Sequence, residues 1–182
     1  IALSAGNVTI SATDSSGISG SASVVIEEVP SFNISVVDKE STGDNSQSQP
    51  ELIRFISSTE GVIVNSKQNT VDFIALTSTD VSITGESINV TNDPDSECSS
   101  IDVSVDESII AVVVSKGSCE RGELYLIDVS TREKFGPYEL GYNPDAVDIA
   151  VDNEFVVVVN EYDYEDGTAG CTTPFYPGVT IW

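Results

Sequence analysis

The loop "NEYDYEDG" follows a run of valines and gathers oxygen-bearing side chains at short spacing. Its candidate metal ligands are Asn160, Glu161, Asp163, Glu165 and Asp166. Hard cations such as Ca²⁺ take about six to eight oxygen ligands, and the closing Gly167 suits a sharp turn. The spacing differs from that of an EF-hand loop. Two interpretations therefore stay open: a calcium site, which makes calcium the candidate cofactor, or an acidic loop that is simply solvated.

Catalytic chemistry has few candidates in this chain. The sequence contains no histidine, so histidine-dependent nucleophilic triads and histidine-based zinc sites cannot be built from it. Paired carboxylates can perform acid–base chemistry, but the 30 acidic residues are too many for one pair to stand out. We expect a protein that is not an enzyme and assign no catalytic residue. The alternative is a calcium-dependent propeller hydrolase whose catalytic residues lie largely outside this segment.

The charge of the chain limits its partners. Thirty acidic and seven basic residues give a formal charge of -23, which repels nucleic-acid phosphates and anionic lipids. No apolar run approaches the roughly 20 residues of a spanning helix. We therefore expect no nucleic-acid partner and no membrane insertion in this segment. Cations, basic proteins and water are the partners that such a surface favours.

Three sequons predict N-linked glycans if the protein is secreted by a eukaryote. They begin at Asn7, Asn33 and Asn89. Glycans at these sites would place the protein outside the cell or on its surface.

Two of the three cysteines are expected to pair. Cys98 precedes one predicted strand and Cys119 follows the adjoining one, so antiparallel pairing brings both to the same end of a hairpin. We predict a disulfide between them. Cys171 is left over, and it either pairs outside this segment or stays a free thiol.

The chain repeats itself with an offset of 46 residues. The stretch "SSIDVSVDESIIAVVVS" is followed by "DAVDIAVDNEFVVVVNE", in which Asp148 and Asp152 match Asp102 and Asp106. A weaker copy, "LIRFISSTEGVIVNS", starts at Leu52. We expect the three copies to fold alike.

Each copy predicts an alternating strand, a two-residue turn, an apolar strand, a loop and a third strand. The turns would be Asp106-Glu107 and Asp152-Asn153, and fourth strands would follow in the first two copies. Four short strands per roughly 40 to 50 residues are typical of a β-propeller blade. Apolar runs such as "IIAVVVS" fit second strands that are buried on both faces. We predict an all-β protein with about three four-stranded blades of a larger ring.

The predicted domains follow from these patterns. Residues 1–30 alternate like a β-hairpin and would be the closing strands of an immunoglobulin-like β-sandwich. Residues 31–51 would be a linker with a lead-in strand, and residues 52–182 an incomplete propeller. Its blades would span 52–87, 88–139 and 140–182. Both ends of the segment are expected to have belonged to something longer.

One face of the predicted propeller is strongly acidic. The loops before the first strand of a blade and after its second strand emerge on the same side of the ring. The carboxylates expected there are Asp93, Asp95, Glu97, Glu120, Asp145, Glu161, Asp163, Glu165 and Asp166.

The segment from "GYNPDAVDIAVDNEFVVVVNEYDYEDG" to "PGVTIW" resembles the choice-of-anchor I family, also described as mesenchyme-specific cell surface glycoprotein-like propellers. The matching residues are Pro144, Asp145, Asp152, Asn160, Glu161 and Gly178. "PELIRF" and "GELYLIDV" also fit, so the resemblance covers Phe32 to Trp182, with departures at Asn153, Tyr162 and Cys171. The first 30 residues resemble the end of an immunoglobulin-like or cadherin-like domain. The resemblance implies an extracellular or surface-attached propeller, with no established catalytic residues.

These observations predict a structural or adhesive module of an extracellular or cell-surface glycoprotein. Its acidic propeller face would serve assembly or partner binding. The partners would be other copies or other extracellular proteins, and packing of tandem domains into a filament or coat is one form that assembly could take.

Overall fold

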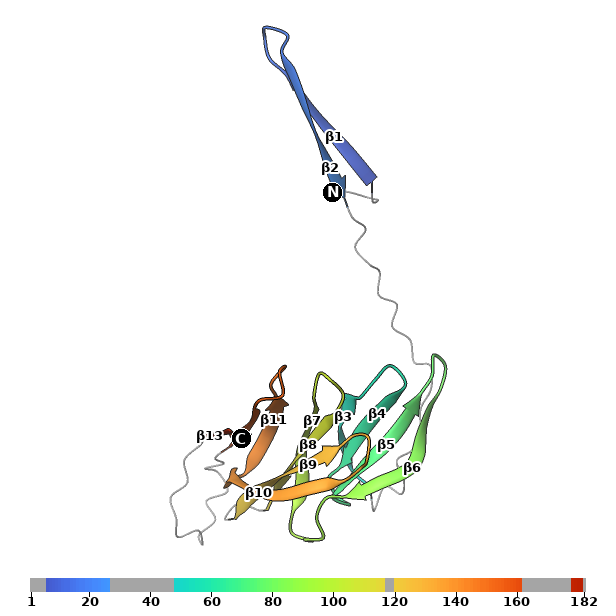
Figure 1. The fold of residues 1–182 in the computed structure, drawn as a ribbon, viewed down its shortest axis with the longest axis vertical. Coiled ribbons are helices and arrows are strands. Elements are labelled where there is room, and N and C mark those ends of the chain that lie inside the picture. Colours follow the sequence, from blue (N-terminus) through green and yellow to red (C-terminus); the bar gives the residue numbers. More distant parts are fainter. Residues whose placement is uncertain (1–5, 27–47, 117–119, 162–177, 182) are drawn as a thin grey trace. The chain divides into compact units, whose positions relative to one another are not determined.

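The computed structural model describes residues 6–26, 48–116, 120–161 and 178–181 (Figure 1). The chain divides into two compact units, Ile1–Val36 and Val37–Trp182. The described residues form strands and connecting loops, which confirms the all-β prediction. They include no helix that is able to cross a membrane.

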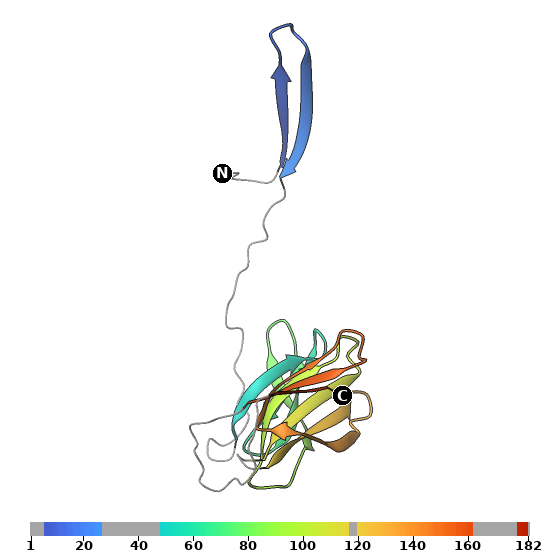
Figure 2. The ribbon, with the colours of Figure 1, turned by 90° about the vertical axis from the view of Figure 1, so that its left-hand side faces the viewer.

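The first unit contains a two-stranded hairpin, as the alternating sequence predicts (Figure 2). Strand β1 (Gly6–Thr13) pairs with β2 (Ser19–Ile26) in antiparallel register. In the turn, one carboxylate oxygen of Asp14 accepts hydrogen bonds from the Ser16 and Ile18 amides, at 2.8 and 3.0 Å. Gly17 has a φ of 86°, which glycine adopts at little cost. The turn chemistry therefore sets the register of this hairpin.

The described part of the second unit holds three antiparallel sheets, and in each one the strands follow chain order. The first sheet is β3 (Pro50–Phe55), β4 (Glu60–Asn65), β5 (Thr70–Leu76) and β6 (Val81–Asn89). The second is β7 (Glu97–Val103), β8 (Ile109–Ser115), β9 (Arg121–Asp128) and β10 (Lys134–Tyr142). The third is β11 (Pro144–Ile149), β12 (Val156–Asn160) and β13 (Gly178–Ile181).

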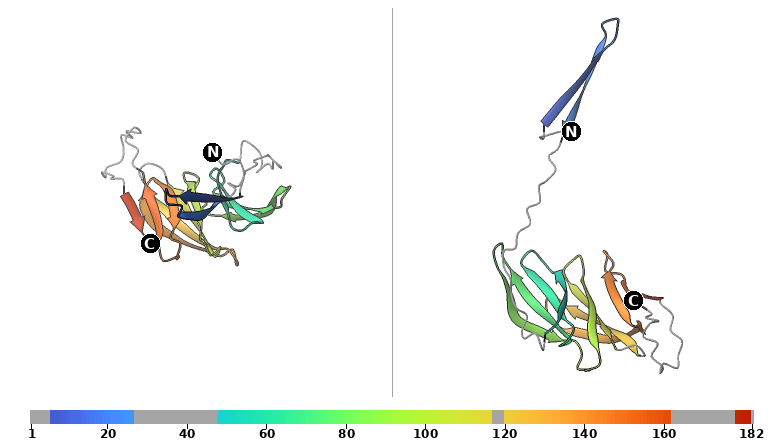
Figure 3. Two further views of the ribbon diagram at one scale, coloured as in Figure 1. Left: turned by 90° about the horizontal axis from the view of Figure 1, so that it is seen from above. Right: turned by 180° about the vertical axis from the view of Figure 1, so that it is seen from behind.

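The second sheet lies between the other two, as Figure 1 and the view from behind in Figure 3 show. Its strand β8 is buried along almost its whole length, because both faces of the sheet are covered. One face packs on the first sheet in a core that includes Phe73, Ile101 and Tyr125. The other packs on the third sheet in an aliphatic core around Val113 and Val158. Burial on both sides explains the continuous apolar sequence of β8.

The predicted two-residue turns are wrong. In the second sheet the Ser104 amide donates a hydrogen bond to Ile109 O, and Ser104 O accepts one from the Glu107 amide. Four residues therefore lie between Ser104 and Ile109, the pair that closes the loop. Ala150, Asn153 and Phe155 repeat this pattern in the third sheet, 46 residues later. A tight two-residue hairpin of type I′ needs positive φ at both central residues, whereas each of these loops has only one, 62° at Glu107 and 59° at Asn153. The loops are therefore longer, but the 46-residue repeat holds in their hydrogen bonds.

Candidate functional site

The carboxylates that can act as a site lie along one edge of the sheets, where first strands begin and second strands end. In the register, Glu97 pairs with Ser115 and Pro144 pairs with Asn160, so the flanking loops emerge on the same side. The Ser99 hydroxyl donates to Pro144 O at 2.7 Å and joins the edges of the second and third sheets. We call this the acidic edge. Its described carboxylates include Asp93, Asp95, Glu97, Glu120, Glu123, Asp145 and Glu161.

The side chain of Asn69 holds the first acidic loop, residues 92–97, in place. Asn69 lies in the β4–β5 turn with a φ of 54° and is 6% exposed. Its Nδ2 donates to Ser96 O at 2.8 Å and Asp93 O at 3.3 Å, while its Oδ1 accepts from the Cys98 amide at 2.9 Å. One buried amide thus ties the first sheet to the loop that begins the second. Sequence reasoning missed Asn69, whose only signal is an Asn in a polar turn, a residue that tolerates positive φ.

The same loop also bonds to itself. The Asp95 amide donates to Asp93 Oδ1 at 3.1 Å, and the Ser96 amide and hydroxyl both donate to Asp93 O. Asp95 and Glu97 are exposed, and Asp93 is partly buried. The backbone that presents these carboxylates is therefore fixed before any partner arrives.

Lys116 is a cation within the acidic edge. Its Nζ lies 3.0 Å from Glu123 Oε1 and 3.9 Å from Asp93 Oδ2, so it bridges the β6–β7 loop and β9. The hydrogen bond with Glu123, with the further charges of Asp93 and Glu120, raises the pKa of Lys116 above its ordinary value. Lys116 therefore stays protonated at neutral pH and offsets part of the local negative charge.

Glu123 also accepts a hydrogen bond from the hydroxyl of Tyr125, at 2.8 Å. Burial, together with this hydrogen bond, raises the pKa of Tyr125 to about 12. The phenol thus remains a hydrogen-bond donor at neutral pH. Glu123 is held from two sides and acts as a positioned acceptor.

The predicted calcium ligands lie only partly within the described residues. Asp163, Glu165 and Asp166 lie outside them, and the calcium site stays a prediction. Asn160 is buried, and its Nδ2 donates to Thr180 Oγ1 at 3.0 Å and Gly178 O at 3.3 Å, while Glu161 is exposed. Within the residues that the structure describes, no three acidic or cysteine side chains converge as a metal site.

Asn160 has a packing role. An added Cβ at Gly141, on β10, would lie 2.5 Å from Asn160 Cγ. The side-chain amide of Asn160 therefore fills a space beside the second sheet that is open only because residue 141 is a glycine. Asn160 Oδ1 is buried and finds no hydrogen-bond partner among the described residues.

Cys98 is fully buried in the core between the first and second sheets, and no other described residue is a cysteine that could pair with it. Burial raises its pKa to about 12, so the thiolate form is strongly disfavoured. Cys98 pairs with Val114 in the register, which agrees with the antiparallel hairpin behind the disulfide prediction. Cys119 and Cys171 lie outside the described residues, and the Cys98–Cys119 pairing stays a prediction.

Of the three sequons, the one at Asn89 is described in most detail. Asn89 ends β6 and is exposed, and its carbonyl accepts a hydrogen bond from Lys134 Nζ at 2.9 Å. Asn7 belongs to β1, and Asn33 lies outside the described residues. Glycosylation at all three stays a prediction.

Asp102 connects all three sheets through one carboxylate. Its Oδ1 accepts from Arg54 Nε on β3 at 3.2 Å, and its Oδ2 accepts from the Ile149 amide on β11 at 2.8 Å. First strands of successive sheets thus lie next to one another, and successive sheets pack face to face. The fold is a partial β-propeller. The 46-residue repeat singles out Asp102 in the sequence. Its hydrogen bonds to the first and third sheets are seen only in the structure.

Comparisons with known proteins find similarity among solved structures. No family model and no curated protein matches the chain. A crystal structure of a protein from Lactobacillus plantarum shares 11% identity with a TM-score of 0.52, over 97% of this chain and 52% of that one. A structure described as the Dos1 propeller shares 13% identity with a TM-score of 0.47, over 85% of this chain and 38% of that one. The chain therefore spans about half or less of the length of each.

Proposed function

We propose that this chain is a non-enzymatic structural or adhesive module of an extracellular or cell-surface protein, and that its acidic edge binds a cationic partner. The partner would be another extracellular protein with a basic surface. The resemblance to surface-attached propellers motivates the location. The fold supports only a generic propeller module, so the adhesive role is the step that needs testing.

The observation that carries the proposal is the fixed backbone of residues 92–97. Asn69 and Lys116 hold this loop from two sides, so the backbone that carries the exposed Asp95 and Glu97 does not have to be ordered upon binding. Binding by a preorganised surface avoids part of the entropy cost of association. Clustered carboxylates also attract cationic partners and speed their encounter.

The test is the binding of a lysine-rich peptide, measured by calorimetry at low and physiological salt. The test variant is Asp145→Asn with Glu161→Gln, two exposed residues of the acidic edge. The matched control is Glu133→Gln with Glu154→Gln, exposed carboxylates in loops at the opposite edge. We expect the first pair to weaken binding several-fold and the second to leave it nearly unchanged. Equal effects of both pairs would mean that the peptide responds only to net charge and would overturn the proposal.

Calcium binding and hydrolase activity are tested on the same protein. Ca²⁺ is titrated by calorimetry, with melting temperature as a second readout, because a ligand specific to the folded state raises it. Heat and a melting shift that disappear in Glu161→Gln would support the calcium site. Turnover in a screen of phosphoester, lactone and glycoside substrates would favour the hydrolase instead and would contradict the non-enzymatic proposal.

The extracellular location is tested by peptide mass mapping of the native protein without reduction, before and after enzymatic deglycosylation. Glycans at Asn7, Asn33 or Asn89, together with a linked Cys98–Cys119 peptide, are expected. Bare asparagines and free thiols would contradict a secreted glycoprotein.

A further inference from the structure

One position in the acidic edge is already occupied by a cation of the chain itself. Lys116 Nζ lies 3.0 Å from Glu123 Oε1 and 3.9 Å from Asp93 Oδ2. The side chains of Lys116, Glu123 and Asp93 are 22%, 19% and 34% exposed, so solvent reaches all three. The Lys116 ammonium therefore neutralises two carboxylates of the edge at a place that a partner from solution is able to reach.

Each of these two carboxylates turns a single oxygen toward the ammonium. Glu123 Oε2 accepts the Tyr125 hydroxyl at 2.8 Å, which leaves Oε1 for Lys116. Asp93 Oδ1 accepts the Asp95 amide at 3.1 Å, and its Oδ2 is the oxygen near Lys116. An arginine side chain binds best to both oxygens of one carboxylate, whereas an ammonium with three donors contacts single oxygens of separate carboxylates. The arrangement therefore suits a primary ammonium.

The positions of the two carboxylates depend mainly on other residues than Lys116. Three hydrogen bonds from and to the buried side chain of Asn69 hold the loop of Asp93. The distance of 3.9 Å between Lys116 and Asp93 is longer than a hydrogen bond, so Asn69 is the stronger restraint on this loop. Tyr125, which is 6% exposed, holds Glu123. An ammonium that replaces Lys116 would therefore meet the same two acceptors.

Replacing one ammonium by another has a small energetic cost. Ion pairs between partly exposed side chains contribute little to stability, because water screens the charges and two long side chains lose freedom. The flexible stem of a lysine lets Lys116 swing into solvent when a second ammonium takes its place. The wild-type affinity for a cationic partner therefore includes the loss of the Lys116 ion pair.

We infer that Lys116 is an intramolecular competitor at the acidic edge: its ammonium occupies a subsite, formed by Glu123 and Asp93, that receives a lysine side chain of the cationic partner. The inference rests on the proposed function, because it assigns the preferred ligand and the regulation of the same edge. Removing the charge of Lys116 then opens the subsite and tightens binding. A purely structural role of Lys116, as a restraint on the loop of Asp93, predicts the opposite sign.

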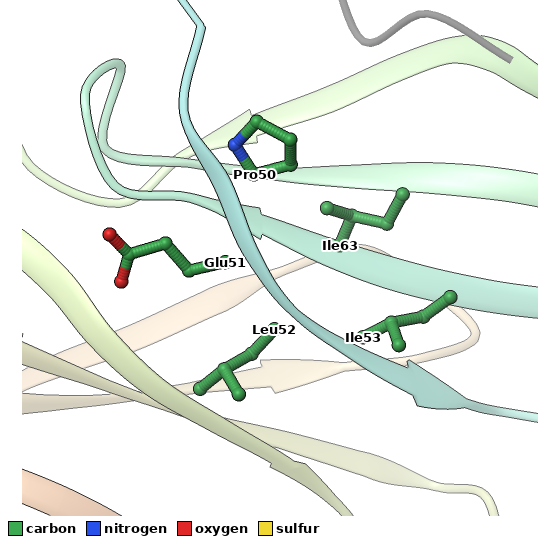
Figure 4. A pocket seen from close by; sticks show the side chains of 5 residues that line it. All are labelled: Pro50, Glu51, Leu52, Ile53 and Ile63. Atoms are coloured by element: carbon green, nitrogen blue, oxygen red, sulfur yellow. The ribbon is translucent and has the colours of Figure 1, made fainter.

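A second carboxylate at this edge provides a matched comparison. Glu51 follows the first residue of β3 and lies in a shallow pocket of about 150 Å³ (Figure 4). The other residues that line this pocket are Pro50, Leu52, Ile53 and Ile63. Glu51 Oε1 accepts hydrogen bonds from two neutral groups, Gln49 Nε2 at 3.0 Å and Ser66 Oγ at 3.1 Å. Within the described residues no lysine or arginine forms an ion pair with Glu51, so it has the charge of Glu123 without an internal competitor.

The test is calorimetric titration with a lysine-rich peptide and an arginine-rich peptide of equal length. Lys116→Gln removes the ammonium at a partly exposed position, and Lys116→Met is a second neutral variant that should act alike. The control is Lys67→Gln, because Lys67 is exposed in the β4–β5 turn at the same edge and pairs with no described carboxylate. Lys116→Gln is expected to tighten binding of the lysine peptide about two- to fivefold more than Lys67→Gln does. The arginine peptide should gain less.

A double-mutant cycle identifies the carboxylate that binds the partner. Glu123→Gln should weaken binding of the lysine peptide more in the Lys116→Gln background than in wild type, whereas Glu51→Gln should weaken both by the same factor. Equal gains for Lys116→Gln and Lys67→Gln, weaker binding by Lys116→Gln, or equal gains for the two peptides would overturn this inference and leave the proposed function in place. If neither wild type nor any variant binds the lysine peptide, the proposed function and this inference are both wrong.

Discussion

The two interfaces of the second sheet are built differently. Between the first and second sheets, long cationic side chains cross the boundary: Arg132 lies over the ring of Phe73, 3.8 Å from its centroid, and bonds to Glu60. Lys134 likewise reaches the Asn89 and Val90 carbonyls. Asn69 also bonds across this boundary to backbone atoms, and between the second and third sheets contacts of that kind, from short side chains to backbone atoms, predominate.

The second of these interfaces depends on register. Ser99 donates to Pro144 O, Ser100 Oγ accepts the Val147 amide at 3.2 Å, and Asp102 accepts the Ile149 amide. Long side chains can adjust by rotation, whereas backbone amides lie at fixed intervals along a strand. The stability of the first interface should therefore depend on the volume and charge of its side chains. The stability of the second should depend on how closely the strands approach each other.

The largest expected effect concerns the volume of the first interface. Phe73 is fully buried, so Phe73→Ala should lower the free energy of unfolding by about 3 to 5 kcal/mol through lost burial and a cavity under Arg132. Urea titration followed by circular dichroism measures the change. Phe55→Ala, at an exposed phenylalanine, should cost far less. Similar losses at both positions would contradict the assignment of this core.

The next largest effect is expected at Asp102, whose carboxylate contacts both interfaces. Asp102→Ala leaves Arg54 and the Ile149 amide without their acceptor and should destabilise the protein by about 1.5 to 3 kcal/mol. A double-mutant cycle with Arg54→Ala separates the two bonds. If Asp102→Ala costs the same with and without Arg54, the amide of the third sheet is the important partner. If Asp102→Ala lowers the free energy of unfolding no more than Asp152→Ala does, neither hydrogen bond of Asp102 stabilises the fold, and the prediction is wrong.

Close approach in the second interface is tested at Gly122. A Cβ there would lie 2.3 Å from Pro144 Cγ and 2.7 Å from Val114 O. Gly122→Ala should therefore push β11 away and cost about 1 to 3 kcal/mol in the same urea titration. Gly20→Ala, where a Cβ meets nothing within 4 Å, is the control. An unchanged midpoint for Gly122→Ala would mean that the sheets separate easily here.

The smallest expected effect is the pH dependence of the loop between β7 and β8. Hydrogen bonds from Ser108, Ser104 and Asn153 lower the pKa of Asp106 below its ordinary value of 3.8, so the folded state binds fewer protons than the unfolded chain. The contribution of Asp106 to the free energy of unfolding is complete above pH 3.8, and it is lost as the pH falls through the lower pKa of the folded state. Asp106→Asn should flatten the acid side of a melting-temperature profile. Glu107→Gln should not.

Much of the fold was predictable because β-propeller strands leave a strong local pattern. The third strands expected near Val71 and Glu123 are β5 and β9, and the fourth strands expected near Val81 and Lys134 are β6 and β10. The turns were predicted too short, because hairpin length depends on backbone φ values that residue types only suggest. The acidic edge could be predicted from the strand order. The roles of Asn69 and Lys116 could not, because their partners lie in loops that only the folded chain brings together.

The sequence by itself determined the order of the described strands and the burial of β8, because alternation and β-branched runs act within a few residues. It also marked Asp102 and Asp148 as equivalent through their shared offset. Only the tertiary structure decided that Asp102 binds Arg54 on one side and the Ile149 amide on the other, while Asp148 is left exposed. The reason is physical: equivalent residues acquire different partners when one sheet has two neighbours and another has a single neighbour among the described residues.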